Sequence, residues 1–347
     1  MEGSHPVSTQ QWRIGRAGPA MAALAYPAIL LGLFNSARMG FTHGQGVGIV
    51  RAILILLALV CVFAVPLFAM VQGIRLGTLH DEPVDMRQTR LVTHLAYASP
   101  ALFTFLGVLT YMAGISSAEY VIWSAIWLVA IVFSVRPARR SPRVDRKIGH
   151  WLPVAHGVTA AVLVVGFIAL HLTNHLVAVA SPEAHVAVMK VLRHWYRSPV
   201  VEPLLVILML FMVGSGFVLV RSKLSAQTDV FGTLQTLTGF YLFIFIAGHM
   251  NSVFVFQRSF VGKDTDFWFA SGGPDGLLAD AWSVRLIPHY VLGVWSVVTH
   301  AACGLRSILI AHGTQARVAN GMTIVLSASS AIAASLMGLA LCRFPLF

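Results

Sequence analysis

Long apolar runs separated by short polar segments make up most of the chain. A membrane-spanning helix needs about 20 mainly apolar residues, and nine stretches approach or exceed that length. They lie near residues 17–37, 50–74, 91–114, 119–135, 151–178, 199–220, 232–257, 284–311 and 321–343. Because the segments between them are short, consecutive helices should be antiparallel neighbours. The pattern predicts an all-α integral membrane protein with about nine transmembrane helices.

The composition agrees with a membrane protein. Hydrophobic residues make up 57% of the chain and charged residues only 11%, against roughly 25% charged residues in soluble domains. A net charge of +11 would also suit nucleic-acid binding, but the basic residues lie in short loops, where they set topology or meet anionic lipid. We therefore expect the lipid bilayer as a partner and no nucleic acid. The first apolar segment is long enough to span, so no cleaved signal peptide is expected.

The distribution of lysine and arginine predicts the orientation. With the amino terminus in the cytoplasm, fifteen of these residues lie on the cytoplasmic side and nine on the other. The cluster RPARRSPRVDRK at 136–147 decides most of this balance. We expect a protein of the bacterial inner membrane with a cytoplasmic amino terminus.

The same basic cluster is the best candidate for a boundary, because prolines and charge interrupt the apolar pattern there. It divides the chain into residues 1–147, an amino-terminal tail with four helices, and residues 148–347, with five helices. The four-helix region could thicken the second bundle, bind a partner or frame a lipid or quinone cleft. The sequence leaves these roles open.

Three histidines, His171, His249 and His300, lie deep inside apolar runs of the second region. Ionisable residues within a membrane are costly and usually functional, and a haem b iron in a helix bundle takes two imidazoles from facing helices. At about 1.5 Å per residue, His171 and His249 reach a similar depth in the outer half. They are predicted to share one iron. His300 falls in the inner half and cannot join that pair.

Each of these histidines, taken alone, could instead be a hydrogen-bonded polar residue inside the bundle. His175, one turn beyond His171, is a rival ligand that we expect at the membrane interface. His156 could contact a haem propionate or a quinone, or could be an interfacial residue. No role is predicted for the remaining histidines that we weighed, which are His43, His80, His94, His150 and His289.

Four aspartates, Asp264, Asp266, Asp275 and Asp280, lie in the segment 261–285. Their spacing lacks the glycine at the sixth position and the terminal glutamate of a twelve-residue calcium loop. Tryptophans within the segment favour an interfacial position. The pattern predicts a capping loop rather than a calcium site.

Four stretches of the second region carry a family resemblance: HGVTAAVLVVGFIALHL at 156–172, VEPLLVILMLFMVGSG at 201–216, LQTLTGFYLFIFIAGH at 234–249 and HYVLGVWSVVTHAACGL at 289–305. Residues from about 146 to 345 resemble the single-chain, five-helix cytochrome b membrane anchor of succinate dehydrogenase and fumarate reductase, which carries two b haems. The more specific features are Leu234, Gln235 and Gly239 before His249, and Gly304 one turn after His300.

The resemblance implies ligands for two haems. By this resemblance, His171 and His249 correspond to the two ligands of the family's outer haem, and His300 corresponds to one ligand of its inner haem. The family's second inner ligand is a histidine four residues before a glycine, but here Met212 stands four residues before Gly216. Thioether sulfur can ligate haem iron; otherwise the inner haem is lost or another residue completes its site. One or two b haems are therefore expected.

Further cofactor contacts implied by the resemblance are less complete. Gln235, Gly239 and Gly304 belong to the features that carry the resemblance and are the candidates for cofactor contacts. His156 is a candidate for a propionate or quinone contact from its position near the inner end of its helix, with an interfacial role as the alternative. Thr236 follows Gln235 where the family often has an arginine, which weakens any transfer of propionate or quinone contacts.

The resemblance implies an electron-transfer subunit that passes electrons between quinone and partner redox subunits of a succinate dehydrogenase or fumarate reductase-like complex. It implies flavoprotein and iron-sulfur partners on the cytoplasmic face, because this chain has neither cluster-type cysteine spacing nor a dinucleotide fingerprint. It would not be catalytic alone. The segment 136–147 could dock such a partner or serve only as a topology signal.

A cofactor-free membrane transporter or structural scaffold with buried histidines is the alternative. Transporters usually contain interrupted helices or paired charges near the membrane midplane. The sequence indicates neither, since Glu119 and Glu202 are expected at helix ends. The pattern therefore favours a cytochrome.

Overall fold

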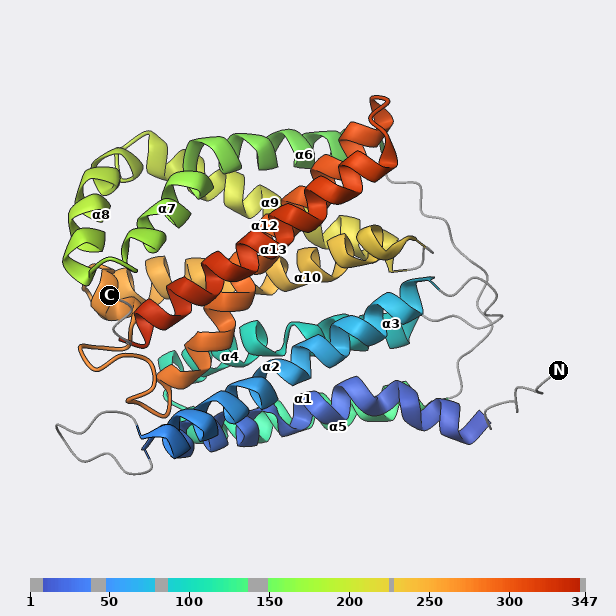
Figure 1. Ribbon diagram of the computed structural model, residues 1–347, viewed down its shortest axis with the longest axis horizontal. Helices are drawn as coiled ribbons and strands as arrows, with labels where there is room; N and C mark the ends of the chain where they lie inside the picture. Colours follow the sequence, from blue (N-terminus) through green and yellow to red (C-terminus); the bar gives the residue numbers. More distant parts are fainter. Residues whose placement is uncertain (1–8, 39–47, 79–86, 137–148, 225–227, 344–347) are drawn as a thin grey trace.

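The computed structural model describes residues 9–38, 48–78, 87–136, 149–224 and 228–343, and every regular element within these ranges is a helix (Figure 1). Eight helical stretches are long and apolar enough to span a membrane, and a bent helix pair is a ninth candidate. The predicted all-α integral membrane fold with about nine spans is thereby confirmed.

Several spans consist of a single long helix or begin with a short 3₁₀ turn. They are α1 (Thr9–Arg38), α2 (Ile49–Thr78), η1 (Ser116–Ala118) with α5 (Glu119–Val135), α9 (Val201–Lys223), η4 (Ser283–Arg285) with α12 (Leu286–Ala311), and α13 (Ala316–Leu341).

The stretch 91–114, expected as one span, is divided into α3 (Arg87–Tyr97) and α4 (Ser99–Met112), which meet at an angle of 68°. Pro100 lies in the first turn of α4. Proline lacks the backbone N–H that would continue the hydrogen bonds of a preceding helix, and its ring clashes with the preceding turn. The bend therefore falls where the sequence introduces this proline.

Two spans contain π-helical turns. The turn η2 (Val164–Ile168) joins α6 (Trp151–Leu163) to α7 (Ala169–Val177), and η3 (Asn251–Phe260) continues α10 (Val230–Met250). Such turns insert an extra residue and rotate the following side chains, and they are frequent at functional sites. In this chain His171 closely follows the first π turn and His249 closely precedes the second.

An additional helix, α8 (Pro182–Tyr196), connects α7 to α9 in a segment for which we expected only a loop. The Ser181 hydroxyl accepts a 3.0 Å hydrogen bond from the Ala184 N–H, and Pro182 occupies the first turn. Glu183 near its start and Arg193 near its end suit the helix dipole. Together with the loop 261–285 and the end of α13, α8 lies at one end of the bundle, the left end in Figure 1, here called the α8 end.

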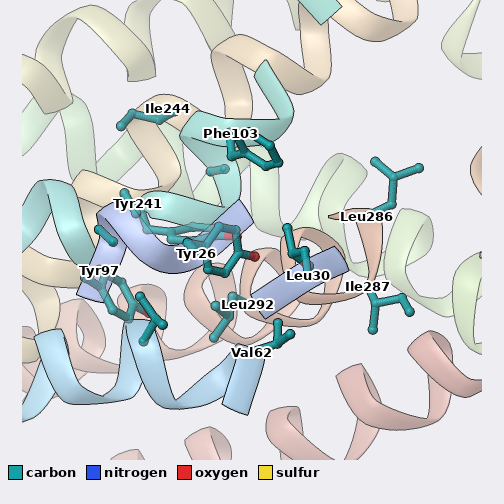
Figure 2. Close-up of a cluster of buried hydrophobic side chains, with 14 of the residues drawn as sticks. Tyr26, Leu30, Val62, Tyr97, Phe103, Tyr241, Ile244, Leu286, Ile287 and Leu292 are labelled. Carbon is teal, nitrogen blue, oxygen red and sulfur yellow. The ribbon is translucent and has the colours of Figure 1, made fainter. Parts of the chain in front are cut away.

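A single buried core joins helices of the first region to helices of the second. The rings of Tyr97 on α3 and Tyr241 on α10 have centroids 5.5 Å apart, and the Tyr97 hydroxyl is 3.0 Å from the Ser296 hydroxyl on α12. Figure 2 shows both tyrosines beside Tyr26 of α1. The proposed boundary at 147 lies outside the described residues, but the helices on its two sides pack against each other.

A buried ion pair also crosses between the two regions. Arg285 in η4 donates to the carboxylate of Glu119 at the start of α5, and both side chains are almost fully buried. A Cβ atom at Gly107 of α4 would lie 2.4 Å from the Arg285 guanidinium. The glycine thus makes room for the pair.

The loop between α10 and α12, which includes the short helix α11 (Phe267–Ala270), uses three of its aspartates for capping and ion pairing. Asp264 accepts a 2.6 Å hydrogen bond from Arg197, and Asp266 caps α11 by accepting from the Phe269 N–H. Asp280 accepts from both the N–H and the hydroxyl of Ser283 at 2.8 Å. These contacts agree with the expected capping loop.

Candidate functional site

A cavity of about 410 Å³ lies between α7, α8, α9, α10 and α12. Its volume is in the range of about 300–1,000 Å³ that is usual for ligand pockets. Aliphatic and aromatic side chains such as Leu205, Met209 and Phe245 form much of its wall. The cavity is therefore an apolar chamber with a limited number of polar groups.

Five histidines line this cavity: His171, His175, His185, His249 and His289. The ring centroids of His171 on α7 and His249 on α10 lie 6.2 Å apart, with 70° between the planes. These are the two histidines for which the helix rise predicted a similar depth in the membrane. The Nε2 atom of His175 lies 3.3 Å from that of His171, so the rival ligand shares the same chamber.

The His249 ring is held by aromatic packing. It stacks on Phe245, one turn earlier on α10, with 5.7 Å between centroids and 8° between planes. Phe245 also contacts His289, at 4.6 Å between centroids. A Cβ atom at Gly293 of α12 would lie 2.4 Å from Phe245. Because Gly293 has no side chain, α12 leaves room for the Phe245 ring that stacks on His249.

Four polar atoms on the cavity wall are buried and have no hydrogen-bond partner among the described residues. They are His185 Nδ1, Asn174 Oδ1, His289 Nδ1 and the Tyr196 hydroxyl. A buried polar group without a partner costs about 1–3 kcal/mol, and native proteins contain few of them. Their grouping around one chamber is the pattern expected where a ligand or ordered water supplies the missing bonds.

The α8 end of the cavity carries charge. Arg193, Arg197 and Arg258 line it together with Glu202 and Asp266. Arg258 pairs with Glu202 at 2.5 Å, and Arg197 and Arg193 both reach Asp264, at 2.6 and 3.5 Å. The hydrogen bond from Arg197 lowers the pKa of Asp264 below its usual value. The rim thus presents cationic groups next to an apolar chamber.

The other residues singled out from the sequence gather elsewhere. Nδ1 of His300 on α12 lies 2.9 Å from the Gln235 carbonyl oxygen, and a Cβ atom at Gly239 would lie 2.8 Å from the His300 ring. The His156 ring on α6 is 6.4 Å from that of His300. Gly304 faces the Gln235 side chain. None of these residues lines the large cavity.

Met212, the candidate thioether ligand, lies on α9; the hydrogen-bond and ring partners of His300 among the described residues are Thr238, Gln235 and His156. The Met212 carbonyl oxygen is 3.4 Å from the hydroxyl of Ser215. The Ser215 hydroxyl lies 2.8 Å from Nδ1 of His156.

Several residues of the cavity wall were not found by sequence reasoning. We predicted no role for His289, which is 4% exposed and lies on the wall, and we did not consider His185. A usable signal existed: His185, Met189 and Arg193 are four residues apart on one face of α8, and all three line the cavity. A search for long apolar runs does not detect an amphipathic helix of this kind.

No family model, curated protein or solved structure matches the chain. Its fold and cavity define an all-α integral membrane protein with a histidine-lined chamber between its helices.

Proposed function

We propose that the chain is a membrane cytochrome b that holds a haem between His171 and His249. The observation that supports this most directly is the 6.2 Å between the two ring centroids. With metal–nitrogen bonds of about 2.0–2.1 Å, as histidine makes with zinc, two imidazoles on opposite sides of one metal have centroids about 6 Å apart. A pair of histidines at this separation on facing helices suits bis-imidazole ligation.

The donor set and the surroundings fit this group. His171 and His249 would supply two neutral nitrogen ligands, and the apolar wall would exclude competing water. Arg193, Arg197 and Arg258 at the α8 end would meet the propionates of a haem b. Bound haem supplies one-electron redox chemistry, while the protein sets orientation and dielectric. Phe245 would fix the plane of the His249 ring.

The proposed role is transfer of electrons between quinone and partner redox subunits, as the family resemblance implies. On this proposal the chain lies in the bacterial inner membrane with its amino terminus in the cytoplasm. Flavoprotein and iron-sulfur subunits of a succinate dehydrogenase or fumarate reductase-like complex would dock on the cytoplasmic face. The basic segment that could dock them lies almost entirely outside the described residues.

Replacement of one ligand by glycine, followed by addition of free imidazole, tests the assignment. His249→Gly protein should lose the spectrum of the haem held by His171 and His249, and regain it with millimolar imidazole, which would occupy the space of the missing ring. His175→Gly, from the same chamber, is the matched control and should keep its haem without imidazole. Full haem content in the His249→Gly variant would overturn the ligand assignment. Rescue by imidazole separates ligand loss from misfolding.

A further inference from the structure

The helix α8 lies across the end of the bundle rather than along it. In Figure 1 it runs transverse to α1 and α10, which follow the long direction of the molecule. It connects the membrane-spanning stretches Trp151–Val177 and Val201–Lys223. The two connecting segments, 178–181 and 197–200, have four residues each and can reach about 14 Å at most. The helix is therefore held near the level at which both spans end, which is the level of a membrane surface.

One face of α8 covers the histidine-lined cavity. His185, Met189 and Arg193 lie on this face and line the chamber. The face is also held by neighbouring elements. Nε2 of His185 is 3.2 Å from the side-chain amide nitrogen of Asn174 on α7, and the His185 ring lies 5.6 Å, centroid to centroid, from that of Phe267 on α11. These contacts fix the rotation of α8 about its own axis.

The rest of the α8 surface divides into a polar edge and an apolar edge. Consecutive residues of a helix point about 100° apart. At that spacing Glu183, Lys190 and His194 fall on one side, and all three are exposed; they form the polar edge. Val191 and Trp195 fall on the other side and are 65% and 68% exposed; they form the apolar edge. The helix thus has three sides: one toward the cavity, one polar and one apolar.

The apolar edge leads into the exposed apolar surface of the next span. Val200, before the first turn of α9, is 75% exposed, and Leu204 and Ile207 on α9 are 50% and 63% exposed. These three residues share one face of the span, and on a membrane-spanning helix such a face meets hydrocarbon. The apolar edge of α8 is therefore continuous along the chain with a surface that faces lipid.

A helix of this composition suits the boundary between lipid and water. Helices with aliphatic and tryptophan side chains on one side and basic and polar ones on the other lie in the plane of the membrane interface. Tryptophan itself is enriched at the level of the lipid headgroups. The Lys190 ammonium group, on the polar edge, has the charge that complements lipid phosphate.

We propose that α8 is an interfacial helix whose apolar edge, Val191 and Trp195, inserts among the phospholipids of the membrane surface, with Lys190 at the level of their phosphates. This contact holds the cover of the chamber in place. A phospholipid surface fits better than a protein partner, because a polar and an apolar edge run side by side along one helix, as water and hydrocarbon do at that surface. The inference goes beyond the proposed cytochrome function and does not depend on bound haem.

Fluorescence quenching in phosphatidylcholine vesicles tests the position of α8. Val191→Cys and Glu183→Cys, each in full-length protein with Cys61→Ser, are labelled with a bimane fluorophore, and the Cys61→Ser parent gives the background. Brominated phosphatidylcholine quenches from the hydrocarbon side and iodide quenches from water. The label at position 191 should be quenched by the brominated lipid and shielded from iodide. The label at position 183, on the polar edge of the same helix, is the matched control and should show the reverse.

Two results would overturn the proposal. Strong quenching by iodide at both positions, with none by brominated lipid, would place both edges in water. Shielding of position 191 from both quenchers would show that a protein, either a second copy of the chain or another partner, covers the apolar edge. Neither result bears on the haem ligands, which the His249→Gly variant tests through its absorption spectrum.

A charge on the apolar edge tests whether the lipid contact holds the cover of the chamber. Val191→Asp should loosen α8 in vesicles, so that a cysteine placed on its cavity face by Met189→Cys reacts faster with a water-soluble maleimide. Burial of one valine side chain corresponds to about tenfold in an equilibrium, and the rate should rise by about that factor. His194→Asp introduces the same residue on the polar edge and should leave the rate unchanged. An unchanged rate in Val191→Asp would contradict the role of the membrane contact.

Discussion

Phe245 on α10 occupies the space that a side chain at Gly293 on α12 would take, since a Cβ atom there would lie 2.4 Å from the Phe245 ring. We predict that Gly293→Ala displaces Phe245 and with it the His249 ring that stacks on it. Overpacking of this kind typically costs about 1–3 kcal/mol. The variant should have a lower thermal midpoint and a reduced haem content. Gly321→Ala on α13, where nothing lies within 4 Å of the added Cβ atom, is the control. Equal thermal midpoints and haem contents in the two variants would contradict the prediction.

His171 and His175 share a face of α7, and their Nε2 atoms are 3.3 Å apart. The His171 ring has its centroid 6.2 Å from that of His249, close to the separation of about 6 Å for two imidazoles on opposite sides of one metal. We predict that His171→Ala loses the haem of this chamber, whereas His175→Ala retains it with an altered spectrum. The haem content of the two purified variants measures the difference. Loss in His175→Ala alone would assign the ligand to His175.

The arginines at the cavity rim should raise the midpoint potential of the haem held by His171 and His249, because nearby positive charge favours the reduced form. We predict that Arg193→Gln lowers this potential by roughly tens of millivolts, where about 59 mV is a tenfold change for one electron. A potentiometric titration measures the shift. Arg317→Gln, at an exposed position of α13, removes the same charge elsewhere and should leave the potential unchanged. An unchanged midpoint potential in Arg193→Gln would contradict the proposed effect of the rim arginines on the haem.

The buried pair of Glu119 and Arg285 should contribute strongly to the packing of the two helix groups. Removal of one member of a buried ion pair typically costs about 3–5 kcal/mol, because the other charge is left unpaired. Glu119→Ala should therefore unfold at a clearly lower temperature in detergent. Asp264→Ala breaks pairs whose carboxylate is 63% exposed, and such pairs contribute about 0–1 kcal/mol. Similar thermal midpoints for the two variants would contradict this prediction.

His185 on α8 predicts a dependence of stability on pH. Burial lowers its pKa below the ordinary value of 6.5, although Asp266 acts in the opposite direction. A histidine that is harder to protonate when folded favours unfolding once the pH falls below its unfolded pKa. The stabilisation is therefore complete above about pH 6.5 and is lost as the pH falls toward the folded pKa. Between pH 7.5 and 5, the thermal midpoint should fall less steeply in His185→Gln than in the wild type. Parallel curves would show that His185 does not contribute to the pH dependence of stability.

The transmembrane fold could be predicted from sequence because spanning helices need only length and apolar composition. The same criterion missed α8, whose Glu183 and Arg193 interrupt the apolar pattern although its caps are readable in the sequence. The bend before Pro100 was not predicted, because the span 91–114 was expected to be continuous. The π turn before His171 depends on packing between helices, and no composition rule reveals it.

The levels of the histidines could be counted from helix rise, which is how His171 and His249 were placed together. Rotation about the helix axis could not be counted, because the π turn between His156 and His171 changes it. The sequence analysis also did not predict that the ring centroids of His156 and His300 lie 6.4 Å apart. The resemblance instead directed attention to Met212 on α9, where the structure has Ser215 in contact with His156.

The central claim is that this chain holds haem between facing histidines, and the reduced-minus-oxidised absorption spectrum of detergent-purified protein tests it most directly. Protein made with adequate haem supply should show the bands of a b-type cytochrome, and His249→Ala should lose the contribution of the haem held by His171 and His249. A wild-type spectrum without haem bands would contradict the account and favour a cofactor-free transporter or scaffold with buried histidines.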